Sequence, residues 1–465
     1  MTQANSPNAA LTVIAPALLA GVVAAVVPPI PVLWAMGVMA LFVLIGGRPM
    51  VGLVLMVLTF PFLAYEVTIG AFHVPPVDCI ALATALAVGG RYAWTWWRTG
   101  VRPAVVPMPG LPAFFALVAI GMLSLLHTDD VWGSAKFLAR PIIFFYLMFV
   151  ALPLQILDTP QRVVRVLHAM FVVGVVVAAM GTWSLALPVE PGALRRAVPI
   201  AIAGIAPLGT NHNLLAEVLV SVIPVGVALA AIHEGMARRW ILGAVVWCTA
   251  IALATFSRNA WLTLAVEGVV GLVAYAYARG VLHRRLVGAG LLIACGALLG
   301  VGLLSLTGVA QSSNRNRIQL TEIAWEQFRA HPWAGSGVGT FTDAVRRDRW
   351  YIADFGQPLD AHGFVQKLLA ETGVLGLLAY CALLATVVRT MVRAYMGTAS
   401  TSPWRVVLLA LLCSVVGSIV FQAFNTSYFV AKLWLPIGIA LAAARLAEEE
   451  TARRVREAHG SRGDA

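Results

Sequence analysis

Charged residues are scarce in this chain. Asp, Glu, Lys and Arg make up 11% of its 465 residues and hydrophobic residues 60%, whereas about a quarter of a soluble globular domain is charged. Many apolar runs reach the roughly 20 residues that a helix needs to cross a membrane. They are continuous and lack the period-two alternation of a barrel strand. The sequence therefore predicts an all-α, polytopic membrane protein.

Several sequence signals are also missing. Residues 1–10 contain no Lys or Arg, and no clear cleavage site follows, so we expect the first apolar run to remain as an anchor. No basic domain accounts for the net charge of +11, so nucleic acid is not an expected partner. The five cysteines lie within apolar runs, without the spacing of a metal site or the even count of a disulfide framework, and we interpret them as core-filling residues. They are Cys79, Cys248, Cys295, Cys381 and Cys413.

The apolar runs predict fourteen spans, with twelve as the alternative because the first two runs are short and joined by a proline-rich segment. The runs cover residues 11–27, 31–46, 50–65, 76–97, 110–126, 138–157, 163–187, 213–233, 239–256, 259–279, 285–307, 362–388, 404–424 and 429–446. An even number is the stronger prediction. The whole chain is then a single membrane domain with a charged tail at 447–465.

The orientation follows from the positive-inside rule, because every second connection is rich in arginine. The basic connections are expected in the cytoplasm, together with both termini, and the others in the periplasm of a bacterial inner membrane. The periplasmic connections are residues 188–212, the turn at 257–259 and a long loop at 308–361.

Five arginines break this rule and are candidates for function. They are Arg195, Arg196, Arg258, Arg315 and Arg317. Because a guanidinium at bilayer depth costs roughly 2.5–3.5 kcal/mol, Arg258 between two apolar runs predicts a polar cavity or an anionic ligand. The alternative is that these arginines reach lipid phosphates or pair with nearby acidic residues, which are Glu190, Asp343, Asp348, Asp354 and Asp360.

The long loop carries its own pattern. Apolar residues between Leu320 and Phe328 fall at helical spacing, which predicts an amphipathic helix. Six basic and six acidic residues between 308 and 361 suit an ordered loop. The following glycines, Gly335 to Gly339, do not follow a strand and so do not indicate a nucleotide site; we expect a flexible turn that lets the loop fold over the site.

Four motifs carry a family resemblance. They are Gly209–Glu217, Thr255–Trp261, Arg317 continuing to Phe341, and His362 with Gly373 and Gly376. Together, over about residues 110–440, they resemble the O-antigen ligase and polymerase superfamily. In the ligase pattern a histidine precedes Asn, Ser or Gln, and nine residues then lead to Gly-x-x-Gly. Here Gly363 follows His362, and nine residues lead to Gly373, so the spacing matches and the second residue departs.

The resemblance implies a glycosyltransferase that takes a glycan from undecaprenyl pyrophosphate at the periplasmic face. For a ligase the acceptor is a hydroxyl of the lipid A core. Guanidinium groups can bind the pyrophosphate bidentately, which gives this role to Arg258 and Arg317, with Arg195 or Arg196 as a third, and Asn213 as a further substrate-binding residue. His362 would act as the general base, with inversion at the anomeric carbon.

The environment of His362 leaves two alternatives open. Asp360 could orient the imidazole or raise its pKa, whereas the N-terminus of a following helix favours the neutral ring. The other periplasmic histidines, His212 and His331, are interpreted as structural. The predicted periplasmic segments contain no Asp-x-Asp, His-x-x-x-His or Cys-x-x-Cys spacing, so no metal ion and no cofactor is expected.

Three other functions compete with a ligase. A polymerase for O-antigen or exopolysaccharide uses the same donor with another glycan as the acceptor, and a protein O-oligosaccharyltransferase belongs to the same superfamily. A lipid or solute transporter would also be polytopic, but it would be expected to show repeated halves and charges in the middle of its spans. No internal repeat is visible in the sequence.

Overall fold

The structure is a computed structural model, and it describes residues 41–63, 67–69, 72–189, 194–201, 204–278, 308–425 and 429–463, with isolated residues between 288 and 302. These residues are largely helical, which confirms the all-α class. One small exception is an antiparallel hairpin of β1 (Val67–Ile69) and β2 (Phe72–Val74), in which Val67 lies opposite Val74.

The contacts divide the chain into two compact units. Among the described residues, one comprises 41–52 and 82–103, and the other comprises those within 53–81 and 104–463. The first contains most of α4 (Pro76–Thr99), whose end carries the paired rings of Trp94 and Trp97 with Arg98 over Trp94. Every residue singled out above for function lies in the second unit. A single membrane domain stays a prediction.

Seven helices in the described part of the chain are long and apolar enough to cross a membrane. They are the continuous helix Val131–Ile156, α8 (Pro160–Ala186), α9 (His212–Ile232), α10 (Gly235–Ala254), α11 (Arg258–Ala278), α16 (Phe364–Gly397) and α17 (Pro403–Ala423). Each corresponds to a predicted apolar run. The first of them consists of α6 (Val131–Phe137), two π-helical stretches (Leu138–Phe144 and Leu147–Ala151) and α7 (Leu152–Ile156).

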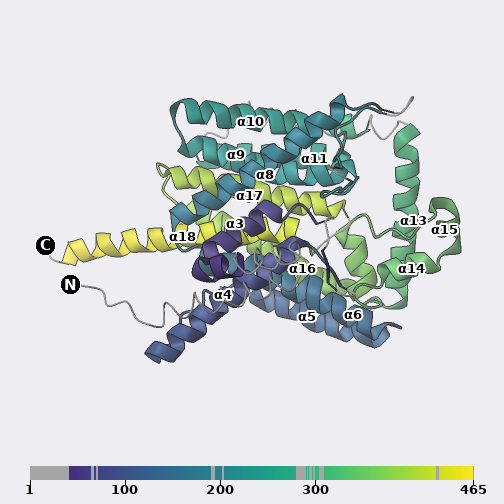
Figure 1. Cartoon of the computed structure of the whole chain (residues 1–465), viewed down its shortest axis with the longest axis horizontal. Helices are drawn as coiled ribbons and strands as arrows, with labels where there is room; N and C mark the ends of the chain where they lie inside the picture. The colour runs from purple at the N-terminus through teal and green to yellow at the C-terminus, as the bar shows by residue number, and fades with distance from the viewer. Residues whose placement is uncertain are drawn as a thin grey trace, which may run out of the picture. The chain divides into compact units, whose positions relative to one another are not determined.

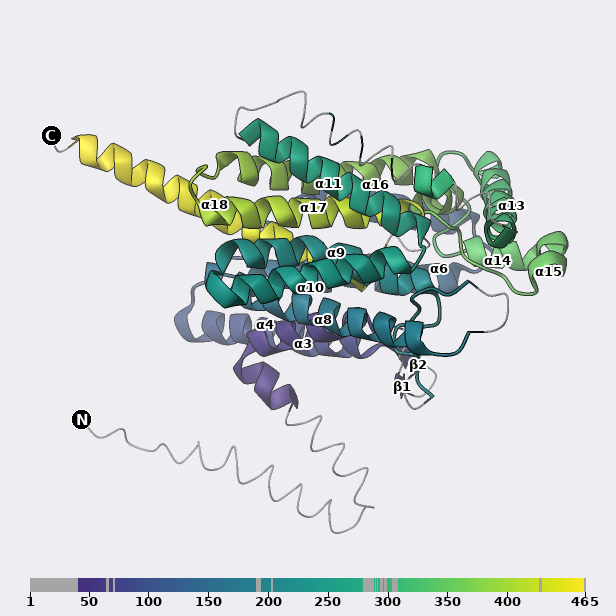
Figure 2. The same cartoon turned by 90° about the horizontal axis from the view of Figure 1, so that it is seen from above.

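Other predicted spans are shorter, more charged or outside the described residues. The runs near 50 and 110 form the shorter helices α3 (Pro49–Thr59) and α5 (Leu111–Ser124), the latter followed by a 3-10 turn, Leu125–His127. Most of the last run lies within α18 (Ala431–Gly463), whose C-terminal part extends beyond the bundle (Figures 1 and 2). Residues 11–27 and most of 31–46 and 285–307 are not described, so the total of twelve to fourteen spans stays a prediction.

Helix α9 packs at the centre of the second unit, against α8, α10 and α17 (Figure 2). Glycines permit the close approach, since a Cβ on Gly226 would press on the Phe171 ring of α8. A buried polar cluster joins α9 to α17 and α18. Gln422 Nε2 and Lys432 Nζ donate to the two carboxylate oxygens of Glu217, at 2.5 and 2.8 Å. Breaking such a buried pair costs about 3–5 kcal/mol, so this cluster fixes the ends of three helices.

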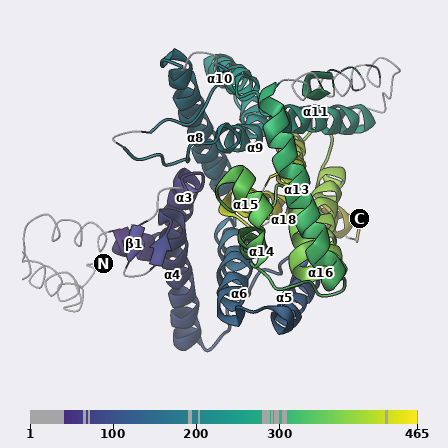
Figure 3. The same cartoon turned by 90° about the vertical axis from the view of Figure 1, so that its right-hand side faces the viewer.

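Three helices close one end of the bundle. They are α13 (Gly308–Ala330), which runs across the ends of the bundle helices, α14 (Phe341–Arg347) and α15 (Arg349–Phe355) (Figures 1 and 3). Leu320 and Ile323 of α13 pack with Phe341, Val345 and Tyr351 in a small core of their own. Helix α13 includes the stretch for which the sequence predicts an amphipathic helix.

The glycine-rich segment after α13 differs from the prediction of a flexible turn. Its backbone is bonded to α16, because Ser336 N donates to Ala370 O at 2.9 Å and Gly337 N to Glu371 O at 3.1 Å. These carbonyls are available because α16 is broken at Gly373, which has φ 66°. A Cβ on Gly373 would collide with the carbonyl group of Trp333. The glycines therefore allow two backbone segments to pack in direct contact.

Candidate functional site

The candidate site lies at the end of the bundle that α13 crosses. Five parts of the chain meet there: the segment 194–201, the start of α9, the turn before α11, α13, and the connection that leads into α16. They bring together five of the six residues that the sequence analysis assigns to the site. These are Arg196, Asn213, Arg258, Arg317 and His362.

The turn before α11 fixes Arg258. Phe256 has φ 51°, the only positive value for a non-glycine residue in the described chain. Ser257 Oγ donates to Asn213 Oδ1 on α9 at 2.7 Å, and Asn259 Nδ2 donates to the carbonyl of Phe424 after α17 at 3.0 Å. The turn is thus bonded on both sides. Arg258 stands at the positive N-terminal end of α11, where an anion is favoured.

Helix α13 supplies the second arginine. Arg258 Nη1 donates to Asn314 Oδ1 at 2.7 Å, and Arg317 follows Asn314 by three residues on the same helix face. Burial, and then the charge of Arg258, lower the pKa of Arg317. Arg317 Nε is buried and has no hydrogen-bond partner among the described residues. An anion bound here would be stabilised by two like charges and would provide an acceptor for the unpaired donor.

His362 lies in the connection before α16. Burial and the charge of Arg317 lower its pKa, and the charge of Asp360 opposes this only in part. The imidazole is therefore neutral near pH 7, the form that can accept a proton. Asp360 therefore does not raise the pKa of His362 above its ordinary value, which rules out that alternative.

Lys367 forms an ion pair with Asp360. Its buried Nζ binds Asp360 Oδ2 at 2.5 Å and lies 3.9 Å from Glu371 Oε1. It also lies over the Phe137 ring at 5.2 Å. One oxygen of the Asp360 carboxylate is thus paired with an ammonium group, and the other accepts from the backbone N–H of Ala361. The sequence analysis did not single out Lys367. A charge one turn into an apolar run was the signal that could have indicated a buried partner for it.

Gly363 accounts for the departure from the ligase pattern. A Cβ at this position would lie 2.7 Å from the carbonyl oxygen of Ala423 and would collide with the Gln366 side chain. In this chain the residue after His362 therefore lies directly against the end of α17, and no side chain fits there.

The segment 194–201 places its two arginines, Arg195 and Arg196, in different surroundings. Arg196 Nη1 lies 3.4 Å from His212 Nε2, and Arg258 is within electrostatic range of the same ring. Burial lowers the pKa of Arg196. Arg195 is exposed and donates instead to the carbonyl of Leu185 at the end of α8. The structure brings Arg196 to the cluster and leaves Arg195 outside it, and it adds His212, which the sequence analysis took as structural.

The remaining histidine, His331, lies outside the cluster. Its ring stacks on that of His127 at 4.3 Å, and His127 Nδ1 bonds the carbonyl of Gly335 at 3.0 Å. These contacts hold the glycine-rich segment and suit the structural role predicted for His331.

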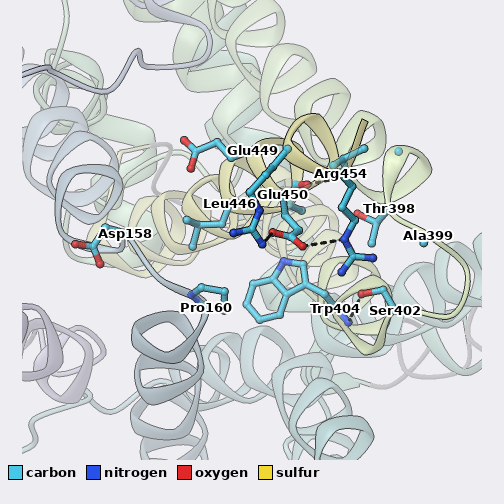
Figure 4. A pocket seen from close by; sticks show the side chains of 14 residues that line it. Asp158, Pro160, Thr398, Ala399, Ser402, Trp404, Leu446, Glu449, Glu450 and Arg454 are labelled. Atoms are coloured by element: carbon cyan, nitrogen blue, oxygen red, sulfur yellow. Dashed lines mark hydrogen bonds and ion pairs between the residues drawn. The ribbon is translucent and has the colours of Figure 1, made fainter. Parts of the chain in front are cut away.

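A cavity of about 510 Å³ opens beside Arg196. Its walls are mainly apolar and come from the end of α8 and the segment 194–201, with Leu187, Val189, Leu194 and Ile200 among them. Larger cavities, of about 710 Å³, lie at the opposite end of the bundle; one is shown in Figure 4. Only the smaller one adjoins the arginine cluster, and an apolar cavity that ends at a guanidinium suits an amphiphile with an anionic head.

Comparison with known proteins supports the resemblance. Residues 243–381 match the family model described as O-antigen ligase. The match includes Arg258, α13 with Arg317, the glycine-rich segment, His362 and the break in α16. No curated protein matches the chain. The recognition made from the four motifs is confirmed by this match, which makes residues 243–381 similar to the O-antigen ligase family.

Proposed function

We propose that the chain is an O-antigen ligase, which transfers a glycan from undecaprenyl pyrophosphate to a hydroxyl of the lipid A core. One observation carries this proposal: the guanidinium groups of Arg258 and Arg317 are brought together with an unsatisfied N–H, beside the neutral imidazole of His362. A dianionic leaving group and a hydroxyl nucleophile need these two kinds of group side by side.

The arginines bind the leaving group. As the glycosidic bond between the anomeric carbon and the pyrophosphate oxygen breaks, that oxygen gains negative charge. Arg258, Arg317 and Arg196 stabilise it with fixed, charge-assisted hydrogen bonds. Three guanidinium groups supply the charge that a divalent cation supplies in other glycosyltransferases, so we expect a metal-independent reaction.

His362 acts on the acceptor. The neutral imidazole takes the proton of the acceptor hydroxyl while its oxygen attacks the anomeric carbon from the face opposite the leaving group. The products are the inverted glycoside, free undecaprenyl pyrophosphate and an imidazolium that releases its proton to water. General-base catalysis of this kind is worth about 10²- to 10⁴-fold.

The membrane setting supports the same substrate. The apolar cavity beside Arg196 is suited to the polyprenyl part of the donor. By the positive-inside rule, the end of the bundle that carries the cluster faces the periplasm of the inner membrane, where such donors are used. The cluster lies at one end of the helices rather than at their middle, which argues against a transporter.

A polymerase is the second candidate, and Gly363 is the observation that favours it. The side chain that the ligase pattern places after the histidine is excluded here by the Ala423 carbonyl. A polymerase would use the same arginines and His362, with the end of a second lipid-linked glycan as acceptor.

A deletion strain distinguishes these functions. Lipopolysaccharide from the strain is run on a gel, and lipid-linked glycan is extracted in parallel. Loss of the ladder with retained lipid-linked polymer supports a ligase, and a core that carries a single repeat unit supports a polymerase. Unchanged lipopolysaccharide contradicts both.

A further inference from the structure

A second charged cavity lies at the other end of α16. It has a volume of about 710 Å³ and is bounded by the last turns of α16, the extended segment 104–109, and α18. The proposed function makes no use of it. Its chemistry is set by one face of α16.

That face carries alternating hydroxyl and guanidinium groups. Thr386, Arg389, Thr390 and Arg393 line the cavity and are spaced so that they share one side of the helix. Within the described chain, neither Arg389 nor Arg393 forms a hydrogen bond or an ion pair. Both side chains are exposed, and an anion bound between two like charges one turn apart would be favoured by both.

The other walls are fixed and partly apolar. The amide of Gln155 makes two hydrogen bonds of 3.2 Å with the backbone of Val106, which holds the extended segment in place. Val105, Met108 and Leu441 add apolar surface. A ligand here would meet both charged and apolar surface.

Arg445 and Glu448 complete the charge of the cavity. Arg445 bonds Glu449 at 3.3 Å and the carbonyl of Leu157 at 2.8 Å, while its buried Nε has no partner among the described residues. Arg445 and Glu449 neutralise each other. Glu448 offsets one of the two positive charges of Arg389 and Arg393, so the cavity has a net charge of one positive unit.

The depth of the cavity indicates where its ligand comes from. Arg389 is 25 residues beyond Phe364, which at 1.5 Å per residue is about 38 Å along the helix. The hydrocarbon core of a membrane is about 30 Å thick. If α16 crosses the membrane, the cavity therefore lies at the level of the lipid headgroups on the face opposite His362.

We propose that this cavity binds the headgroup of an anionic phospholipid, with Arg389 and Arg393 on its phosphate and the glycerol end of its acyl chains along Val105 and Met108. Basic pockets between membrane helices are suited to such headgroups, and the charge-assisted bonds to phosphate oxygens relieve the repulsion between the arginines. The site is independent of the transfer reaction.

A neighbouring cavity provides the control. It lies on another side of α18, and Figure 4 shows Glu450 bound to the arginines on its rim. Both Arg453 and Arg454 pair with Glu450, at 2.5 and 2.8 Å. These arginines stand at the same end of the molecule, but they are already neutralised.

Binding is measured on purified, delipidated full-length protein by native mass spectrometry and thermal unfolding. The probes are dioctanoyl phosphatidylglycerol, dioctanoyl phosphatidylcholine and inorganic phosphate. We expect phosphatidylglycerol to bind most tightly, and the double variant Arg389→Gln/Arg393→Gln to weaken it at least tenfold through the loss of charge-assisted bonds. Arg453→Gln/Arg454→Gln should leave its affinity unchanged.

Three results would overturn the proposal. Equal affinity for phosphatidylglycerol and phosphatidylcholine would remove the need for an anionic headgroup. Stabilisation by inorganic phosphate alone would assign the cavity to a soluble anion, and equal loss in both double variants would reduce the effect to the net charge of this end of the protein. If the double variant at α16 fails to fold, the single variants Arg389→Gln and Arg393→Gln decide the same point.

Discussion

Replacing Lys367 with methionine should change the pH at which the enzyme works rather than remove its activity. Lys367 Nζ lies 2.5 Å from Asp360 Oδ2 and neutralises that carboxylate. In the unaltered protein, burial and the charge of Arg317 lower the pKa of His362. In Lys367→Met the charge of Asp360 is no longer neutralised and acts on His362. A nearby negative charge favours the imidazolium, so the pKa of His362 should rise.

The size of the change follows from the charges. A carboxylate about 6 Å from an imidazole favours the imidazolium by about 2.8 kcal/mol at an effective dielectric constant of 20, or about two pKa units. Asp360 is partly exposed, and we therefore expect a rise of about one unit. Because the base must be neutral, activity in the variant is lost at low pH and recovers as the pH rises through the raised pKa.

The assay is kcat/KM for glycan transfer by purified protein between about pH 5 and 9. Asp360→Asn should move the rising limb to lower pH, because the charge of Lys367 then acts alone, and Lys367→Met/Asp360→Asn should lie close to the original. The pH dependence of diethyl pyrocarbonate modification at His362, followed by peptide mass spectrometry, reports the same ionisation without activity. An unmoved limb and an unmoved modification profile in folded Lys367→Met would refute the reasoning, whereas a moved modification profile without any transfer activity would count against the proposed function alone.

Five further tests address the site, the fold and the orientation. His362→Ala should lower transfer by about 10²- to 10⁴-fold with unchanged thermal unfolding; near-normal turnover would rule out a general base. Arg258→Lys should lose most activity despite its charge, because an ammonium cannot form a bidentate fork, and EDTA should have no effect on the unaltered protein; rescue of EDTA-treated enzyme by Mg²⁺ would contradict the arginine mechanism. Gly373→Ala should lower the free energy of unfolding by about 1–3 kcal/mol, because its φ of 66° and the adjoining Trp333 backbone exclude a Cβ, and an unchanged unfolding curve would show that the break in α16 can relax. A cysteine at the exposed Trp350 should react with an impermeant thiol reagent in spheroplasts and one at the exposed Ala399 should not; the reverse pattern would invert the predicted orientation.

The membrane helices were predictable because their signal is local. A continuous apolar run has one stable state in a bilayer, a helix with its backbone bonds satisfied internally. Arg258 was singled out for a related reason, since a charged group at the edge of an apolar run is costly and needs a compensating role. Arg317 lies inside the long loop and was singled out by the positive-inside rule and the family resemblance.

Contacts between distant segments were not predictable in the same way. Arg195 and Arg196 are equivalent by sequence, and only the extended backbone turns their side chains in different directions, one toward Leu185 and the other toward His212. Lys367 is a single charge in a long apolar helix, and its partners become visible only when the connection before α16 folds back. The glycines of the long loop indicated conformational freedom, but their use is the close approach of two backbones.

The break in α16 accounts for the fixed spacing between His362 and the paired glycines. The nine residues before Gly373 form two and a half turns of helix, and the break at their end exposes the carbonyls of Ala370 and Glu371 to the glycine-rich segment. The same nine residues place Glu371 one turn from Lys367, and Lys367 one turn from the connection that carries Asp360. A residue added or removed between His362 and Gly373 would rotate the charged side chains before it by about 100° around the helix axis, relative to the break at Gly373. Either the glycine-rich segment or Asp360 would then lose its partner, so the spacing is a requirement of the packing that holds His362 in place.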